Sequence, residues 1–280
     1  MNSAPDPQKP ELIDLADSTI RAPRPVVKSP YLSVVIPIYN EEDNVALLQQ
    51  EIEKALGSYD YELILVDDGS RDKTLERIVP NERTRVLSFA KNAGQSAAMY
   101  AGLHASRGEV AALLDGDLQN DPLDIPKLLA EIDKGADLVC GYRAKRKDTA
   151  FKRFQSRVAN NVRSRFVGDG VRDTGCTLKA MRRECISALY PFTGMHRFIP
   201  ALIKGAGFKI MEVPVNHRAR HSGVSKYGFA NRAIKATRDM FGVRWLLSRQ
   251  FRYNVAKELG GSAKPGSEVY SWVRSIGPKE

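Results

Sequence analysis

Short apolar runs alternate with amphipathic stretches through the first half of the chain. The runs are rich in Val, Ile and Leu, stop at turn residues, and predict strands at 31–40, 61–70, 84–90, 109–117 and 136–143. Between them, apolar residues recur at helical spacing and predict helices at 41–56, 71–79, 94–106 and 124–135. Continuously apolar strands that alternate with helices predict an α/β fold, with a Rossmann-like, mainly parallel sheet and helices on both faces.

The second half of the chain has a different pattern of apolar and charged residues. It predicts a strand at 173–183, a helix at 196–207, a strand from 208 that runs into a basic loop ending at 228, and amphipathic helix at 229–255. Residues 1–30 contain six prolines and predict a disordered tail, and the Gly/Ser/Lys-rich end, 259–280, predicts a flexible one. The expected organisation is therefore a tail (1–30), an α/β domain (31–228), a basic helical segment (229–258) and a second tail (259–280).

Polar clusters follow three of the predicted strands. They read "YNEE" at 39–42, "DDGS" at 67–70 and "DGDLQND" at 115–121. In a parallel α/β sheet, ligands bind beyond the carboxyl ends of the strands. The sequence therefore predicts that these clusters lie together at one edge of the sheet and form a binding site.

The acidic clusters allow two interpretations each. Asp115 and Asp117 suit a hard cation such as Mg²⁺, which takes one or two carboxylates and fills its shell with water and substrate phosphate oxygens. The alternative is an acidic loop that caps a helix beginning at Pro122. Asp67 and Asp68 either accept hydrogen bonds from a nucleobase or ribose, or belong to a turn that caps the next helix. Spacing alone leaves these alternatives open.

The formal net charge of +10 indicates an anionic partner, which nucleic acid, a phospholipid surface or a phosphorylated small molecule would satisfy. Part of this charge lies in "RARHSGVSKYG", where glycine and serine separate Arg220 from Lys226. Such a loop is either a solvated basic surface or a phosphate clamp. Nucleic acid is disfavoured because the acids at 115–121 would repel its phosphates and no nucleic-acid-binding motif is present.

Several protein classes are excluded by missing patterns. Cys140, Cys176 and Cys185 form neither a disulfide framework nor a CxxC pair, which favours a reducing cytosol. No HExxH, GxSxG or GxxxxGK[ST] pattern occurs, so zinc hydrolases, serine hydrolases and P-loop NTPases are disfavoured. There is no secretory h-region and no apolar run near the ~18 residues of a membrane span. We therefore expect a protein that contacts a membrane without crossing it.

The ordered motifs together resemble those of glycosyltransferase family 2, and within it the polyprenyl-phosphate glycosyltransferases. The resemblance runs from about Leu32 to about Arg249 and is carried by "SVVIPIYNEE", "LILVDDGSRDKT", "KNAGQSAAMYAGL", "LLDGDLQNDP", "DTGCTLKAMRR", "RFIPAL" and "RARHSGVSKYG". It implies a GT-A type fold and an inverting, metal-dependent enzyme. The donor would be a nucleotide-diphosphate sugar, favouring UDP over GDP, and the acceptor a polyprenyl phosphate.

The resemblance also implies roles for individual residues. The nucleotide pocket would comprise Pro37, Tyr39, Asn40, Glu41, Asp67 and Asp68. Mg²⁺ or Mn²⁺ and the diphosphate would be held by Asp115, Asp117 and Gln119, next to Gly116, where many relatives have alanine. Arg143 would reach the donor phosphates or sugar, and Asp173 would lie near the acceptor. The lipid phosphate or donor diphosphate would be held by Arg220, Ser225 and Lys226.

A phosphate monoester acceptor is already ionised near neutral pH, so it needs positioning more than deprotonation. In-line attack then inverts the anomeric centre while the metal stabilises the departing diphosphate. Asp173 is either a weak base or an orienting group, and the ionised nucleophile favours orientation. The alternatives are the same fold acting on a saccharide or another lipid, and a non-catalytic membrane-binding module.

The basic segment 143–166 carries Phe151, Phe154 and Phe166 at helical spacing among many lysines and arginines. It predicts either a helix in an anionic membrane interface or an ordinary amphipathic helix packed on the domain. The segment 229–255 allows the same two interpretations. We therefore expect a peripheral protein on the cytoplasmic face of a membrane, with a separate membrane protein or a second copy as a further partner.

Overall fold

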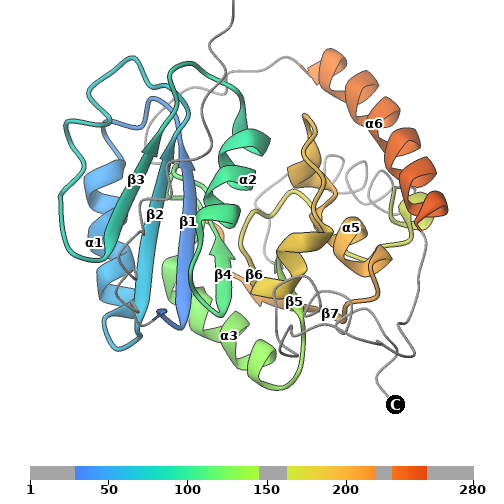
Figure 1. Ribbon diagram of the computed structural model, residues 1–280, viewed down its shortest axis with the longest axis horizontal. Helices are drawn as coiled ribbons and strands as arrows, with labels where there is room; N and C mark the ends of the chain where they lie inside the picture. The colour runs from blue at the N-terminus through green and yellow to red at the C-terminus, as the bar shows by residue number, and fades with distance from the viewer. Residues whose placement is uncertain (1–28, 145–162, 219–228, 251–280) are drawn as a thin grey trace, which may run out of the picture.

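A seven-stranded sheet forms the centre of the molecule (Figure 1). The structure is a computed structural model that describes residues 29–144, 163–218 and 229–250, with side chains in the last range from 237 onward. The strands are β1 (Leu32–Ile38), β2 (Tyr61–Asp67), β3 (Thr84–Ser88), β4 (Val110–Leu113), β5 (Leu138–Arg143), β6 (Lys179–Arg182) and β7 (Ile210–Val215). Their order is β3-β2-β1-β4-β6-β5-β7, and only β6 runs antiparallel to its neighbours. The predicted mainly parallel α/β sheet is confirmed.

Helices cover both faces of the sheet. They are α1 (Val45–Leu56), α2 (Gln95–Ala105), α3 (Ile125–Asp133), α5 (Ile199–Gly205) and α6 (Phe229–Arg249), with short 3-10 turns at Pro122–Asp124, Arg183–Ala188 and Met195–Arg197. One hydrophobic cluster packs α1 and α3 against the sheet. A second packs α2, α5 and α6 against the opposite face. The result is a three-layer α/β/α arrangement.

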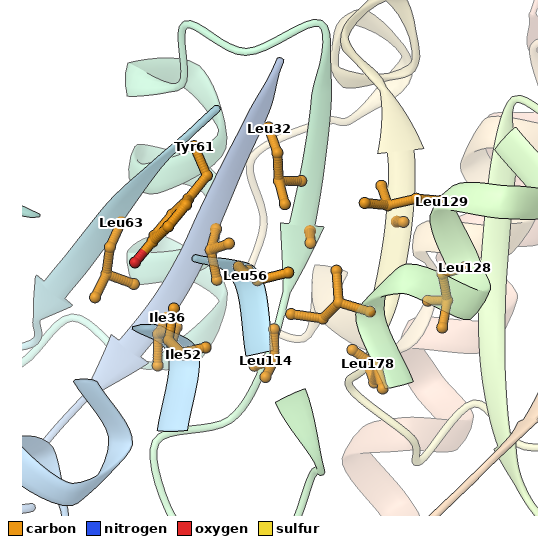
Figure 2. Close-up of a cluster of buried hydrophobic side chains, with 14 of the residues drawn as sticks. Leu32, Ile36, Ile52, Leu56, Tyr61, Leu63, Leu114, Leu128, Leu129 and Leu178 are labelled. Atoms are coloured by element: carbon orange, nitrogen blue, oxygen red, sulfur yellow. The ribbon is translucent and has the colours of Figure 1, made fainter. Parts of the chain in front are cut away.

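The core follows from the alternation of side chains along the strands. Leu32, Val34 and Ile36 of β1 join the α1 side, whereas Val35 joins the α2 side. Figure 2 shows the first of these clusters, in which Ile52 of α1 packs with side chains from the neighbouring strands. Strands buried on both faces explain why the sequence has continuous apolar runs there.

The predicted helix at 71–79 is wrong, because this segment forms turns. Asp72 accepts hydrogen bonds from the backbone N–H and the hydroxyl of Thr74. The Thr74 hydroxyl in turn accepts the N–H of Glu41. Side chains that satisfy local backbone groups in this way compete with helix formation. The predicted strand at 173–183 is also shorter than expected, because only Lys179–Arg182 pairs with neighbouring strands.

A buried carboxylate stabilises the amino-terminal edge of the sheet. Glu62 is 3% exposed and accepts hydrogen bonds from Ser33, Arg85 and Arg107. Burial pushes the pKa of Glu62 upward, but the bonds from Arg85, Ser33 and Arg107 outweigh it and leave the pKa below its usual value. This network lies away from the acidic clusters and serves the fold.

We expect Glu62→Gln to lower the free energy of unfolding by about 2 kcal/mol at pH 7, because two guanidinium groups lose a charged partner. The folded pKa lies below the unfolded one, so the contribution is present above the unfolded value of about 4.3 and is lost as pH falls through the folded pKa. Urea unfolding of both proteins at pH 7 and pH 3 measures this. An equal difference at the two pH values would contradict the assignment.

Candidate active site

The order in which the chain adds strands to the sheet reverses between β1 and β4. From β1 it moves outward to β2 and β3, then returns to β4 on the other side of β1. Such a switch point opens a crevice at the carboxyl ends of the strands. The segments that leave β1, β2, β4 and β5 there carry the predicted site residues of the described chain (Figure 1).

Asp115 follows the end of β4, and other side chains hold both of its carboxylate oxygens. Gln95 donates to Oδ1 at 2.9 Å and Thr177 donates to Oδ2 at 2.6 Å. Burial raises the pKa of Asp115. Thr177 lowers it, the nearby charge of Asp117 raises it, and the cations of Lys179 and Arg143 lower it. Asp115 is therefore oriented by neighbours and lies within electrostatic reach of both Asp117 and Arg143.

We call residues 115–121 the acidic turn. Leu118 at its centre is 4% exposed and has a φ of 61°, a left-handed conformation that is unusual for leucine. Hydrogen bonds within the turn stabilise it, because Asp117 accepts the N–H of Gln119 and Asn120 accepts the N–H of Asp115. The half-buried side chains of Asp117 and Gln119 are thus presented on a fixed backbone.

Gly116 allows the acidic turn to lie directly on the end of β1. A Cβ at this position would lie 3.0 Å from Cγ2 of Ile38 and 3.2 Å from the carbonyl oxygen of Pro37. It would also lie 3.7 Å from Cγ of Glu41, which brings Glu41 and the acidic turn together. An alanine here requires the end of β1 to shift by a few tenths of an ångström.

Asp67 and Asp68 at the end of β2 both form hydrogen bonds within the chain. Asp67 accepts the N–H of Ser70 and the hydroxyl of Ser88. Asp68 accepts the N–H groups of Ala93 and Gly94, just before α2. Both carboxylates are buried, so each fixes a loop at the site edge. The turn chemistry that the sequence allowed is present, and the role of either residue toward a nucleotide stays a prediction.

The segment after β1 connects the same edge to the 70–74 loop. Asn40 has a φ of 53° and exchanges hydrogen bonds with Ser70 and Arg71. Tyr39 and Pro37 are partly exposed at this edge. At the predicted nucleotide pocket, hydrogen bonds therefore join the loop that follows β1 to the loop that follows β2.

Arg143 and Asp173 form a two-bond ion pair at the end of β5. Arg143 Nε lies 2.7 Å from Asp173 Oδ2, and Nη2 lies 2.8 Å from Oδ1. Both side chains are largely buried. Gly175 makes room for this pair, because a Cβ there would lie 2.9 Å from Arg143 Nη2. The structure thus joins two residues that the sequence could only place separately.

Three residues that contribute to the site were not predicted individually from the sequence. Gln95 and Thr177 hold Asp115, and Lys179 is 2% exposed with its Nζ donating to the carbonyl oxygen of Cys176. All three lie in the motifs "KNAGQSAA" and "DTGCTLKAMRR", which were already recognised. For Lys179 the available signal was a charged residue at the start of the short strand β6, because a lysine is seldom buried without a partner.

The residues of the acidic turn fit a hard divalent cation. Burial raises the pKa of Asp115, the nearby charge of Asp117 raises it further, and a bound cation would favour the ionised form of both carboxylates. No group of three or more His, Cys, Asp or Glu side chains suited to a metal occurs among the described residues. An ion at Asp117 would therefore need the amide of Gln119, water and substrate phosphate, as Mg²⁺ sites commonly do.

Two predicted regions lie outside the described residues. They are the phosphate-binding residues Arg220, Ser225 and Lys226, and most of the segment 143–166, including Phe151 and Phe154.

The sheet order, with the acidic turn at the switch point, is that of a GT-A type fold. A model described as Glycosyl transferase family 2 matches residues 33–189. A solved structure of glucosyl-3-phosphoglycerate synthase from Mycobacterium tuberculosis, with Mn²⁺, UDP and phosphoglyceric acid, has the same fold. The TM-score is 0.59 and the sequence identity is 22%. The superposition covers 79% of this chain and 78% of that one.

Two curated relatives extend the match. A dodecaprenyl-phosphate galacturonate synthase from Rhizobium johnstonii is 41% identical over 244 residues, 83% of this chain and 72% of that protein. An undecaprenyl-phosphate 4-deoxy-4-formamido-L-arabinose transferase from Pseudomonas fluorescens is 39% identical over 203 residues. That match covers 70% of this chain and 60% of the relative, so the chain spans less than two thirds of its length. The chain belongs to glycosyltransferase family 2.

We expect Gly175→Ala to reduce catalytic turnover by roughly 10–100-fold, because the new methyl group displaces the Arg143 guanidinium from Asp173. Gly242→Ala in α6 is a matched control, since a Cβ there meets nothing within 4 Å. Steady-state kinetics and thermal unfolding of both variants measure the effect. Equal turnover in Gly175→Ala and the control would show that the pair tolerates displacement.

Proposed function

We propose that this protein transfers a sugar from a nucleotide-diphosphate donor, a UDP-sugar in preference to a GDP-sugar, to a polyprenyl phosphate. The reaction inverts the anomeric centre and uses Mg²⁺ or Mn²⁺. The observation that carries the proposal is the juxtaposition, at one sheet edge, of the acidic turn and the Arg143–Asp173 pair. Asp115 and Arg143 interact electrostatically there.

The bound cation would neutralise charge on the departing nucleoside diphosphate. Asp115, Asp117 and Gln119 would hold that cation, and Gln95 and Thr177 would orient Asp115 for this role. Arg143 adds positive charge near the donor phosphates or sugar. Pro37, Tyr39, Asn40, Glu41, Asp67 and Asp68 would form or support the nucleotide pocket.

Asp173 would serve as an orienting group. Both of its oxygens accept hydrogen bonds from one guanidinium, so the carboxylate is already engaged in positioning Arg143. The acceptor phosphate needs little deprotonation, so fixing Arg143 is the more useful task. Arg220, Ser225 and Lys226 would bind the acceptor phosphate or the donor diphosphate.

The relatives support the acceptor class, because two of them are named for transfer to dodecaprenyl or undecaprenyl phosphate. The structural neighbours support the donor class, because they are complexes with UDP and Mn²⁺ or Mg²⁺. A direct test incubates the purified protein with UDP-sugars, undecaprenyl phosphate and Mg²⁺, and detects the lipid-linked sugar by mass spectrometry. Transfer to a saccharide but to no polyprenyl phosphate would replace the proposed acceptor.

We expect Asp117→Asn to abolish metal-dependent nucleotide binding, because the amide removes the charge that attracts the cation while keeping the side-chain shape. Calorimetry with UDP, in the presence and absence of Mn²⁺, measures this. Unfolding by urea serves as the control for folding. Binding of Mn²⁺ and UDP with unchanged affinity would remove Asp117 from the metal site.

Helix α6 supports a peripheral membrane location. Its inner side packs on the core through Val243 and Leu247, whereas Phe241 is 59% and Trp245 63% exposed. Arg238, Arg244 and Arg249 are exposed on the same helix. An aromatic and cationic surface suits an anionic membrane interface. Along the described part of the chain, no helix combines the length and the apolar character of a membrane span.

The proposed location is the inner face of the cytoplasmic membrane. A separate membrane protein or a second copy as partner rests on the sequence alone. Replacement of Phe241 and Trp245 by serine is expected to reduce cosedimentation with anionic phospholipid vesicles by about tenfold. Val79→Ser, at another exposed apolar position, is the control. Unchanged sedimentation of the double variant would rule out this surface.

A further inference from the structure

Residues Asn216–Arg218, which we call the tether, leave the end of β7 and lie against the acidic turn. The N–H of Arg218 donates to the carbonyl oxygen of Gln119 at 2.9 Å, and His217 forms an antiparallel bridge with Asn120. The N–H of Asn216 donates to Asp124 just beyond the turn, at 2.6 Å. The backbone of the tether therefore lies directly against the acidic turn and is hydrogen-bonded to it.

The side chain of Arg218 links the tether to a distant helix. Its Nη1 lies 2.9 and 2.7 Å from the two carboxylate oxygens of Glu51 in α1. Its Nη2 lies 2.7 Å from Asp121 at the end of the acidic turn. Burial pushes the pKa of Arg218 down, and the bonds to Glu51 and Asp121 outweigh it and raise the pKa. The charge of Arg218 is therefore engaged by protein carboxylates.

The acidic turn needs such external support for two reasons. Leu118 is held in a left-handed conformation that leucine avoids, and the surrounding fold must maintain it. In addition, Asp115, Asp117 and Asp121 lie within seven residues, and their like charges disfavour a tight turn. Arg218 offsets the charge of Asp121 and ties the far end of the turn to α1.

We propose that Glu51, acting through Arg218, is a positioning residue that holds the acidic turn in the geometry required for metal and diphosphate binding. This inference rests on the proposed function. Glu51 lies 167 positions from Arg218 in the sequence and outside every motif that carries the family resemblance, so nothing in the linear pattern indicates it. It would act without touching the metal or the substrate.

The first test is amide hydrogen exchange of the full chain, which needs no ligand. Glu51→Gln and Arg218→Gln are expected to speed exchange at the amides of Asp115 and Gln119, which bond within the turn. Glu53→Gln is the matched control, because Glu53 lies on the same helix and interacts with Arg83 and Tyr61, away from the acidic turn. Exchange that stays unchanged in Glu51→Gln, or rises equally in the control, would overturn the proposal.

The second test measures binding of UDP with and without Mn²⁺. Glu51→Gln is expected to weaken Mn²⁺-dependent UDP binding by about tenfold, as loss of outer support does at other metal sites, and to leave metal-free UDP binding unchanged. Arg218→Lys should lose less affinity than Arg218→Gln, because an ammonium group can still reach one carboxylate. An equal loss with and without metal would indicate general destabilisation and overturn the positioning role.

The two proposals fail in different ways. If the unmodified protein shows no metal-dependent nucleotide binding, the proposed function fails and the positioning role falls with it. If the unmodified protein binds Mn²⁺ and UDP and Glu51→Gln binds them equally well, only the positioning role fails.

Discussion

Burial of carboxylates at one edge of the sheet is the constraint on which the structure around the site depends. The ends of β2 and β4 and the segment after β5 each bring acids to this edge, and a buried carboxylate needs hydrogen-bond donors or cations as partners. The chain supplies them from distant elements. Backbone amides hold Asp68, hydroxyl and amide groups hold Asp115, and guanidinium groups hold Asp173 and Asp121.

This arrangement separates acids that hold loops of the fold from acids that we propose to serve the chemistry. Asp67 and Asp68 fix loops, and Asp115 is oriented between Gln95 and Thr177. Asp117 is presented by a turn whose conformation is set by its neighbours. A divalent cation bound at this edge of the sheet would balance the negative charge of the acidic turn and of a bound diphosphate. The packing that places the carboxylates there is thus linked to the proposed transfer reaction.

Much of the first half could be predicted from the sequence, because apolar runs and helical spacing are local signals. The strands from β1 to β5 and the acidic turn lie where the pattern placed them. The helix predicted at 71–79 is wrong because Asp72 and Thr74 bond to the local backbone, and a periodicity argument does not detect such bonds. The antiparallel β6 was not anticipated, since strand direction depends on pairing between distant segments.

The contacts between residues of the site were harder to predict than the positions of those residues along the chain. The Arg143–Asp173 pair and the Glu51–Arg218 link join residues that are 30 and 167 positions apart, and only the folded register brings them together. Motif resemblance indicated Arg143 and Asp173 as separate residues. It gave no indication of Glu51, which lies in the middle of an ordinary amphipathic helix.

Anomalous diffraction from crystals grown with Mn²⁺ and UDP would locate the cation relative to the acidic turn. We expect a manganese peak at the acidic turn, within coordination distance of Asp117 and of the diphosphate oxygens. A structure with UDP bound at the carboxyl edge and manganese absent from the acidic turn, or bound elsewhere, would contradict it.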